Sequence, residues 1–220
     1  MKKTGQHEIT GTIVNVSGLR VGGSDDLLQI GGTDLTVIKH PVTLRPYIPG
    51  SSLKGGLRSE LEKRLGKFGR GGTEPCGCGQ ETCLVCRVFG PHKNTNYQYG
   101  PTRIIVRDCP VTGDFALEHK TENVINRKTG AAEHPRTLER VAAGAKWDMR
   151  ISIQEWDLDA PCSHVPQGKT AAVKGGQALI EFVLDGLRAV VQTGIGSGIS
   201  RGSGEIKIEN LKVNGEPRTL

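Results

Sequence analysis

The chain has 220 residues, enough for one large domain or two small ones, and it can bury an ordinary hydrophobic core without disulfides. Lysine and arginine total 29 against 23 acidic residues, and the net charge of +6 favours a polyanionic partner. The N-terminal lysines precede no apolar run of about 7 to 15 residues, and no window approaches about 18 consecutive apolar residues, which argues against a signal peptide and a membrane span. We therefore expect a cytoplasmic protein with no membrane partner. In that reducing compartment, clustered cysteines are more often metal ligands than disulfides.

The first half of the chain predicts one strand and one helix. Residues 7–16 (HEITGTIVNV) are rich in β-branched side chains, as is typical of a strand. Residues 49–52 (PGSS) then offer a turn and a serine N-cap. Leucines recur at every fourth position from Leu53 to Leu65, which predicts a helix with a single apolar stripe.

The N-terminal end of this predicted helix combines hydroxyl groups with cations. Ser51 and Ser52 precede Lys54 and Arg58, which lie one turn apart. Free backbone N–H groups at a helix start, together with two cations, can bind a phosphate. The alternative is an ordinary helix cap with solvated charges, and these residues taken alone favour it.

The second half of the chain completes a recognisable order of elements. Residues 103–108 predict a short strand, and residues 147–153 alternate between apolar and polar side chains, as a longer strand does. Residues 176–191 predict a second helix, and the closing stretch 204–213 alternates until Asn210, where we expect a bulge. The order β-α-β-β-α-β is the ferredoxin-like (RRM-like) arrangement, an α+β fold with helices on one face of an antiparallel sheet. This fold hosts many functions, so it does not assign one.

A cysteine cluster interrupts this pattern. Residues 67–100 show little hydrophobic periodicity and predict a loop-like insertion in a single domain. Four cysteines in a C-x-C-x4-C-x2-C spacing can place four thiolates around a zinc ion, and four thiolates close the coordination shell, so we expect a structural zinc knuckle. A redox pair and unmetallated thiols are the alternatives, and His92 could replace one ligand. The expected ligands are Cys76, Cys78, Cys83 and Cys86.

Three further segments carry a more specific pattern: IPGSSLKGGLR (48–58), ENVINRKTGAAEHPRTLER (122–140) and GIGSGISRGSG (194–204). In this order they resemble the backbone subunits of type III CRISPR effector complexes, the RAMP proteins that polymerise along guide RNA. The likeness is greatest to the type III-A and III-D assemblies. It extends from about residue 8 to residue 213 and departs mainly at the cysteine insertion.

The resemblance implies a single RAMP domain over residues 1–220, in which residues 118–140 form the hairpin that the family calls a thumb. It implies binding to guide crRNA and target RNA, and assembly with further copies of the chain and with other CRISPR effector subunits. Such a subunit must hold any guide sequence, which suits contacts to phosphates and 2′-hydroxyls. Val124 and Ile125 would be the apolar wedge of the thumb. The implied RNA-binding residues are Arg20, Ser51, Ser52, Lys54, Arg58, Asn126, Arg127, Arg136 and Arg201, with Lys128 as a further polar contact.

The resemblance also implies where target RNA would be cut. Family members that cleave use an aspartate in a loop after the first strand, and the matching residue is Asp34 in IGGTDLTVIKHP. A carboxylate there could deprotonate the attacking 2′-hydroxyl or hold a divalent cation, and in the family cleavage depends on a divalent metal, which implies Mg²⁺. Asp108 and Glu122 fall at acidic positions of the family pattern and rank second. Arg20 stands where many relatives have a histidine, so one candidate acid or base is missing.

We therefore expect a metal-dependent endoribonuclease that acts within an antiviral complex, and three other hypotheses stay open. The chain could be a non-catalytic, structural RNA-binding subunit. It could process the guide precursor, although such enzymes generally pair two ferredoxin-like domains and rely on histidine chemistry. A zinc-dependent hydrolase is disfavoured because the expected ligands are all cysteines.

Overall fold

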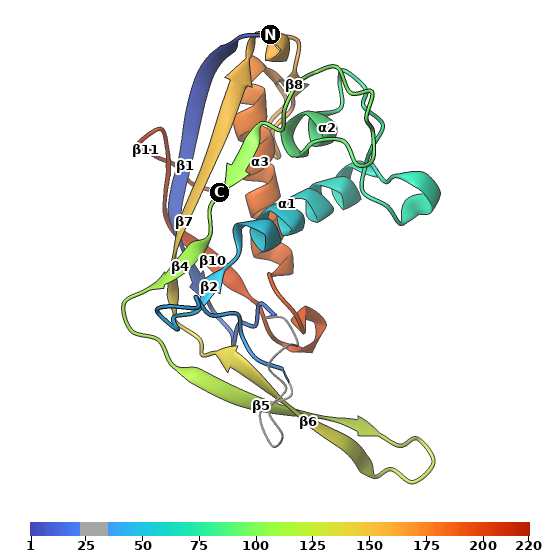
Figure 1. Cartoon of the computed structure of the whole chain (residues 1–220), viewed down its shortest axis with the longest axis vertical. Coiled ribbons are helices and arrows are strands. Elements are labelled where there is room, and N and C mark those ends of the chain that lie inside the picture. Colours follow the sequence, from blue (N-terminus) through green and yellow to red (C-terminus); the bar gives the residue numbers. More distant parts are fainter. Residues whose placement is uncertain (23–34) are drawn as a thin grey trace.

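The computed structural model describes residues 1–22 and 35–220 (Figure 1). An antiparallel sheet forms one layer, and helices α1 (Gly50–Leu65) and α3 (Gly175–Thr193) cover one of its faces. A hairpin of β5 (Leu117–Ile125) and β6 (Ala132–Val141) projects from this body. Within the described ranges, no helix is long and apolar enough to cross a membrane.

The sheet centres on β1 (Lys3–Asn15), which pairs with β7 (Lys146–Trp156) on one side and β10 (Ile206–Val213) on the other. The neighbour order is β11-β10-β1-β7-β4-β2, with β3 also beside β7, and the ladders described are all antiparallel. The chain thus runs strand, helix, short strands, long strand, helix, strand, and the predicted α+β class is confirmed. The remaining strands are β2 (Tyr47–Ile48), β3 (Ile104–Val106), β4 (Cys109–Thr112), β8 (Ser163–His164), β9 (Val173–Lys174) and β11 (Glu216–Pro217).

The core lies between the sheet and the two long helices. Every second residue of the central strands faces the helices, so Ile9, Ile13 and Ile151 are fully buried. The predicted leucine stripe of α1 is buried as far as Leu61, whereas Leu65 at the helix end is 48% exposed. Helix α3 crosses the middle of this layer, so its apolar stripe is longer than that of α1 and more completely buried.

The predicted bulge near Asn210 is confirmed. Thr10 of β1 lies opposite Lys212 of β10, but Thr12 lies opposite Glu209, so β10 carries one extra residue. Asn210 takes up the extra residue with a φ of 53°, a conformation that asparagine adopts more readily than most residues.

Two local predictions were wrong. The N-cap of α1 is Pro49, with no side-chain cap hydrogen bond, and the two serines lie inside the first turn. The insertion is not loop-like throughout, because it contains α2 (Leu84–Phe89), whose six residues are all buried. Three short 3₁₀ turns complete the described structure: η2 (Arg70–Gly72), η3 (Asp157–Asp159) and η4 (Ile199–Arg201).

Candidate RNA interface and metal centre

The four predicted zinc ligands lie together. The sulfur atoms of Cys76, Cys78, Cys83 and Cys86 are all within 4.8 Å of one another, and individual pairs lie 3.6 to 3.9 Å apart. A tetrahedral zinc ion with Zn–S bonds of about 2.3 Å requires sulfur atoms about 3.8 Å apart. The cluster therefore has the size and the donor set of a four-cysteine zinc site.

Local structure explains how these cysteines converge. Cys83 is the N-cap of α2 and Cys86 lies within that helix, while the other two ligands come from the preceding turn. The hydrogen bond between Cys83 and Cys86 lowers the pKa of Cys83 and raises the pKa of Cys86, so Cys83 forms the zinc-binding thiolate more readily than Cys86. His92 contributes its backbone N–H to the Cys76 carbonyl at 3.1 Å and is not a member of the cluster.

Helix α1 supports the first of these ligands. Arg58 donates from Nη2 to the Cys76 carbonyl oxygen at 2.7 Å and from Nε to Glu62 at 2.8 Å, and Glu62 accepts the Cys76 N–H at 2.9 Å. Arg58 was predicted to contact RNA, but its guanidinium is engaged with the knuckle. These hydrogen bonds give Arg58 a structural role that requires no RNA ligand.

The start of α1 already holds a carboxylate. Asp108 accepts the N–H of Gly50 at 2.7 Å, so the acid that ranked second for catalysis acts as a cap at the positive end of the helix. Ser51 remains exposed in this first turn, and Lys54 is half-buried beside it. Burial, and then the charge of Arg58, lower the pKa of Lys54.

The thumb hairpin and the glycine-rich loop meet in the structure. Arg201 of the loop lies 3.0 Å from Glu122 of β5, and Arg136 of β6 lies 3.1 Å from the same carboxylate. A cavity of about 830 Å³ lies beside them, and its lining includes Arg127, Val124 and Ile125. Predicted RNA contacts from two distant segments of sequence are thus brought to one hollow.

Arg20 lies against the same glycine-rich loop. It donates to Ser197 Oγ at 2.9 Å, and its own carbonyl oxygen accepts the Ser197 N–H at 2.9 Å. Gly196 has a φ of 87°, and a Cβ atom there would overlap the Arg20 carbonyl oxygen, so glycine is required for this close approach. Leu19, the preceding residue, pairs with Val141 at the base of the hairpin.

Asn126 has a local role at the hairpin tip. Its side-chain oxygen accepts the N–H groups of Lys128 and Thr129, and its Nδ2 donates to Glu133 at 2.8 Å. These bonds close the turn, so the asparagine shapes the tip whether or not RNA is present.

Asp34 lies outside the described residues. Its chain neighbour Leu35 is described: the Leu35 carbonyl oxygen accepts the N–H of Glu139 of β6 at 2.9 Å, and Glu139 in turn accepts the N–H of Val37. The segment that follows the predicted catalytic position is therefore bound to the hairpin.

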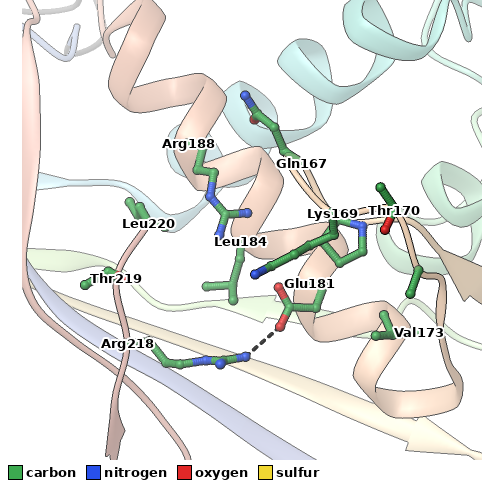
Figure 2. Close-up of a pocket in the computed structure, with 12 residues that line it drawn as sticks. Gln167, Lys169, Thr170, Val173, Glu181, Leu184, Arg188, Arg218, Thr219 and Leu220 are labelled. Carbon is green, nitrogen blue, oxygen red and sulfur yellow. Dashed lines mark hydrogen bonds and ion pairs between the residues drawn. The ribbon is translucent and has the colours of Figure 1, made fainter.

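A second hollow lies away from this interface. Figure 2 shows it between α3, the loop around Lys169 and the segment around Thr219. Its volume is about 570 Å³. Arg218 and Glu181 pair across it at 2.6 Å. Its lining, as far as the structure describes it, includes none of the predicted site residues.

Comparison with known proteins identifies the family. Residues 12–207 match the RAMP superfamily. The chain belongs to the RAMP superfamily. It is 37% identical over 232 residues to the CRISPR system Cms endoribonuclease Csm3 of Methanothermobacter thermautotrophicus, covering 95% of this chain and 86% of that protein. It is 33% identical to the Csm3 protein of Methanocaldococcus jannaschii, with 96% and 81% covered.

The fold agrees with this RAMP assignment. A chain from the crystal structure of a Csm3-Csm4 subcomplex in the type III-A CRISPR-Cas interference complex superimposes with a TM-score of 0.60 at 23% identity, covering 97% of this chain and 80% of that one. Together with the family match and the two relatives above, this confirms the resemblance to type III backbone subunits. Within this RAMP chain, the sequence did not reveal the supporting residues Glu62 and Glu139, because only the fold brings them to the backbone N–H groups of Cys76 and Val37 that they accept from.

Proposed function

We propose that this chain is a backbone subunit of a type III CRISPR interference complex that binds guide crRNA, polymerises along it and cleaves complementary target RNA at regular intervals. The observation that supports this most directly is the convergence of the hairpin and the glycine-rich loop on one hollow with cationic and apolar lining. Guide and target RNA, further copies of the chain and other effector subunits would be its partners, in the cytoplasm.

We further propose one RAMP domain over residues 1–220 with a ferredoxin-like core, a zinc-knuckle insertion at residues 67–100 and a thumb at residues 118–140. The spacing of the four cysteine sulfur atoms supports zinc in the knuckle. All four donors are thiolates, which leaves no open position for a reacting water, so the zinc would hold structure.

In the proposed reaction, Asp34 would deprotonate the attacking 2′-hydroxyl of the target or hold the divalent cation. A bound Mg²⁺ would supply charge relief at the scissile phosphate. Arg20, Arg127, Arg136 and Arg201 would bind phosphates, and Val124 and Ile125, 60% and 45% exposed, would separate neighbouring bases and so favour the in-line geometry.

The test is Asp34→Ala in the reconstituted complex, with Asp25→Ala as the matched control from the same stretch of sequence. We expect Asp34→Ala to assemble and bind target RNA while cleavage falls by at least about 100-fold, as expected for loss of a general base or a metal ligand. The control should cleave normally. Unchanged cutting by Asp34→Ala at every site would overturn the catalytic assignment, and absence of cutting by the wild-type subunit would favour a purely structural role.

A further inference from the structure

Glu122 joins three segments of the chain at the proposed RNA interface. Its carboxylate lies 3.0 Å from Arg201 Nε in the glycine-rich loop, 3.1 Å from Arg136 Nη2 on β6 and 3.4 Å from Lys120 Nζ on its own strand. Lys120 also donates to the Arg201 carbonyl oxygen at 2.6 Å, which is a second link between hairpin and loop. Across the hairpin, Glu122 and Arg136 are directly opposite in the strand register.

The exposure of these groups is uneven. The Glu122 side chain is only 12% exposed, whereas Arg136 and Arg201 are 51% and 52% exposed. The carboxylate is therefore largely covered, while much of each arginine side chain stays open to solvent. Both arginines line the hollow of about 830 Å³, so a ligand there can reach them from the open side.

Glu122 carries its charge at neutral pH. Burial alone would raise the pKa of this carboxyl, but hydrogen bonds from Arg136, Arg201 and Lys120 outweigh burial and lower it. Three cations around one carboxylate leave a net positive charge beside the hollow. Planar guanidinium groups bind phosphates through parallel, charge-assisted hydrogen bonds.

A carboxylate close to a phosphate site is unfavourable if only charge matters, because it repels the ligand. A favourable effect of Glu122 on RNA binding must therefore come from ordering the arginine side chains. These side chains have many rotamers, and fixing them before binding reduces the conformational entropy that is lost when RNA binds. The ion pairs of Glu122 fix two arginines at once, and they also fix the loop relative to the hairpin.

We propose that Glu122 is a positioning residue for RNA: it holds Arg136 and Arg201, from two separate segments, in the relative placement that binds phosphates of one RNA strand. This inference rests on the proposed function. It predicts the opposite sign from simple electrostatics, since removing a negative charge from a polyanion site should otherwise tighten binding.

The experiment measures binding of a polyuridine single strand to the full chain over a range of salt concentrations. We expect Glu122→Gln to weaken binding about tenfold and to reduce the slope of log affinity against log salt by about 0.7 for each phosphate that the arginines no longer neutralise. Glu209→Gln is the matched control. Glu209 pairs with Lys207 on β10, so this substitution removes the same charge at a position away from the hollow. Tighter binding by Glu122→Gln, or equal effects of the two variants, would overturn the proposal.

A double-mutant cycle separates positioning from a general loss of structure. If Glu122 acts through the two arginines, Glu122→Gln should have a smaller effect in an Arg201→Ala background than in wild type, and little further effect when Arg136 is alanine as well. If Glu122→Gln merely unfolds the hairpin, it will weaken binding equally in both backgrounds, and the proposal fails. Wild-type protein that does not bind the strand at all would overturn the proposed function itself, whereas normal wild-type binding with additive variants would overturn only the role of Glu122.

Discussion

Arg58 of α1 donates a 2.7 Å hydrogen bond to the backbone carbonyl oxygen of Cys76, the first cysteine of the knuckle. The Cys76 N–H is bound from the same helix by Glu62, which is itself paired with Arg58. Both backbone polar groups of this ligand are therefore fixed by the helix whose N-terminal end belongs to the proposed RNA interface. The knuckle is continuous with the core, and its loss should affect more than the insertion.

The first prediction concerns removal of the metal. Cys86→Ser should abolish binding of one zinc per chain and lower the free energy of unfolding by more than about 3 kcal/mol, because α2 would release buried Val85, Val88 and Phe89. Zinc content by elemental analysis and urea denaturation are the measurements. Cys162→Ser alters another buried thiol outside the cluster and should keep its zinc.

In cleavage assays, EDTA would remove both the proposed Zn²⁺ and the proposed Mg²⁺. If the knuckle is structural, Mg²⁺ added back alone should restore cutting only in protein that has kept its zinc. Full stability of zinc-free Cys86→Ser would show that the cluster does not brace the fold.

The second prediction concerns a buried cluster of three charged side chains, one of which lies on helix α2 of the knuckle. Asp159 accepts hydrogen bonds from Arg103 at 2.8, 2.9 and 3.1 Å and lies 3.6 Å from Arg87 of α2, and all three side chains are fully buried. Asp159→Asn would leave two buried guanidinium groups without their counter-charge, so we expect a loss of about 3–5 kcal/mol in the free energy of unfolding.

The matched control is Asp157→Asn, two residues earlier and 45% exposed, which should change stability by less than about 0.5 kcal/mol. If the two substitutions lower the free energy of unfolding equally in urea denaturation, the buried charges of Arg87, Arg103 and Asp159 contribute no more to stability than an exposed ion pair does.

Periodicity and spacing were sufficient for the main elements and for the metal cluster, since strand alternation, the leucine stripe and the cysteine spacing are local signals. The roles of Arg58 and Asp108 were not predictable, because each depends on a partner that only the tertiary fold brings near. The serine cap failed for a related reason: an aspartate 58 residues away already binds the first N–H group of the helix, so no serine is needed there. The Glu122 cluster is a similar case, in which the family pattern singled out the residue but not its partners.

The third prediction concerns the pH dependence of stability through Lys54. Burial, followed by the neighbouring charge of Arg58, lowers its pKa from the ordinary value of 10.5. Between the lowered pKa and 10.5, the unfolded chain binds more protons at this site than the folded chain, so the free energy of unfolding rises with pH through that window. At pH 7 the folded state carries the cost of a half-buried ammonium group. Lys54→Gln should therefore be more stable than wild type at neutral pH, and this difference should shrink as the pH approaches 10.5.

Urea denaturation of both proteins at a series of pH values measures the difference directly. Lys63→Gln, which removes the same charge from a position of α1 that is 56% exposed, supplies the baseline for this helix. A gap between wild type and Lys54→Gln that stays constant with pH, or that follows the Lys63→Gln baseline, would contradict the prediction. If the difference in the free energy of unfolding shrinks as the pH rises, Lys54 lowers the stability of the folded chain at neutral pH. A residue that lowers stability in this way is expected to be kept for another purpose, such as binding RNA phosphates. Binding of the polyuridine strand should then fall more for Lys54→Gln than for Lys63→Gln.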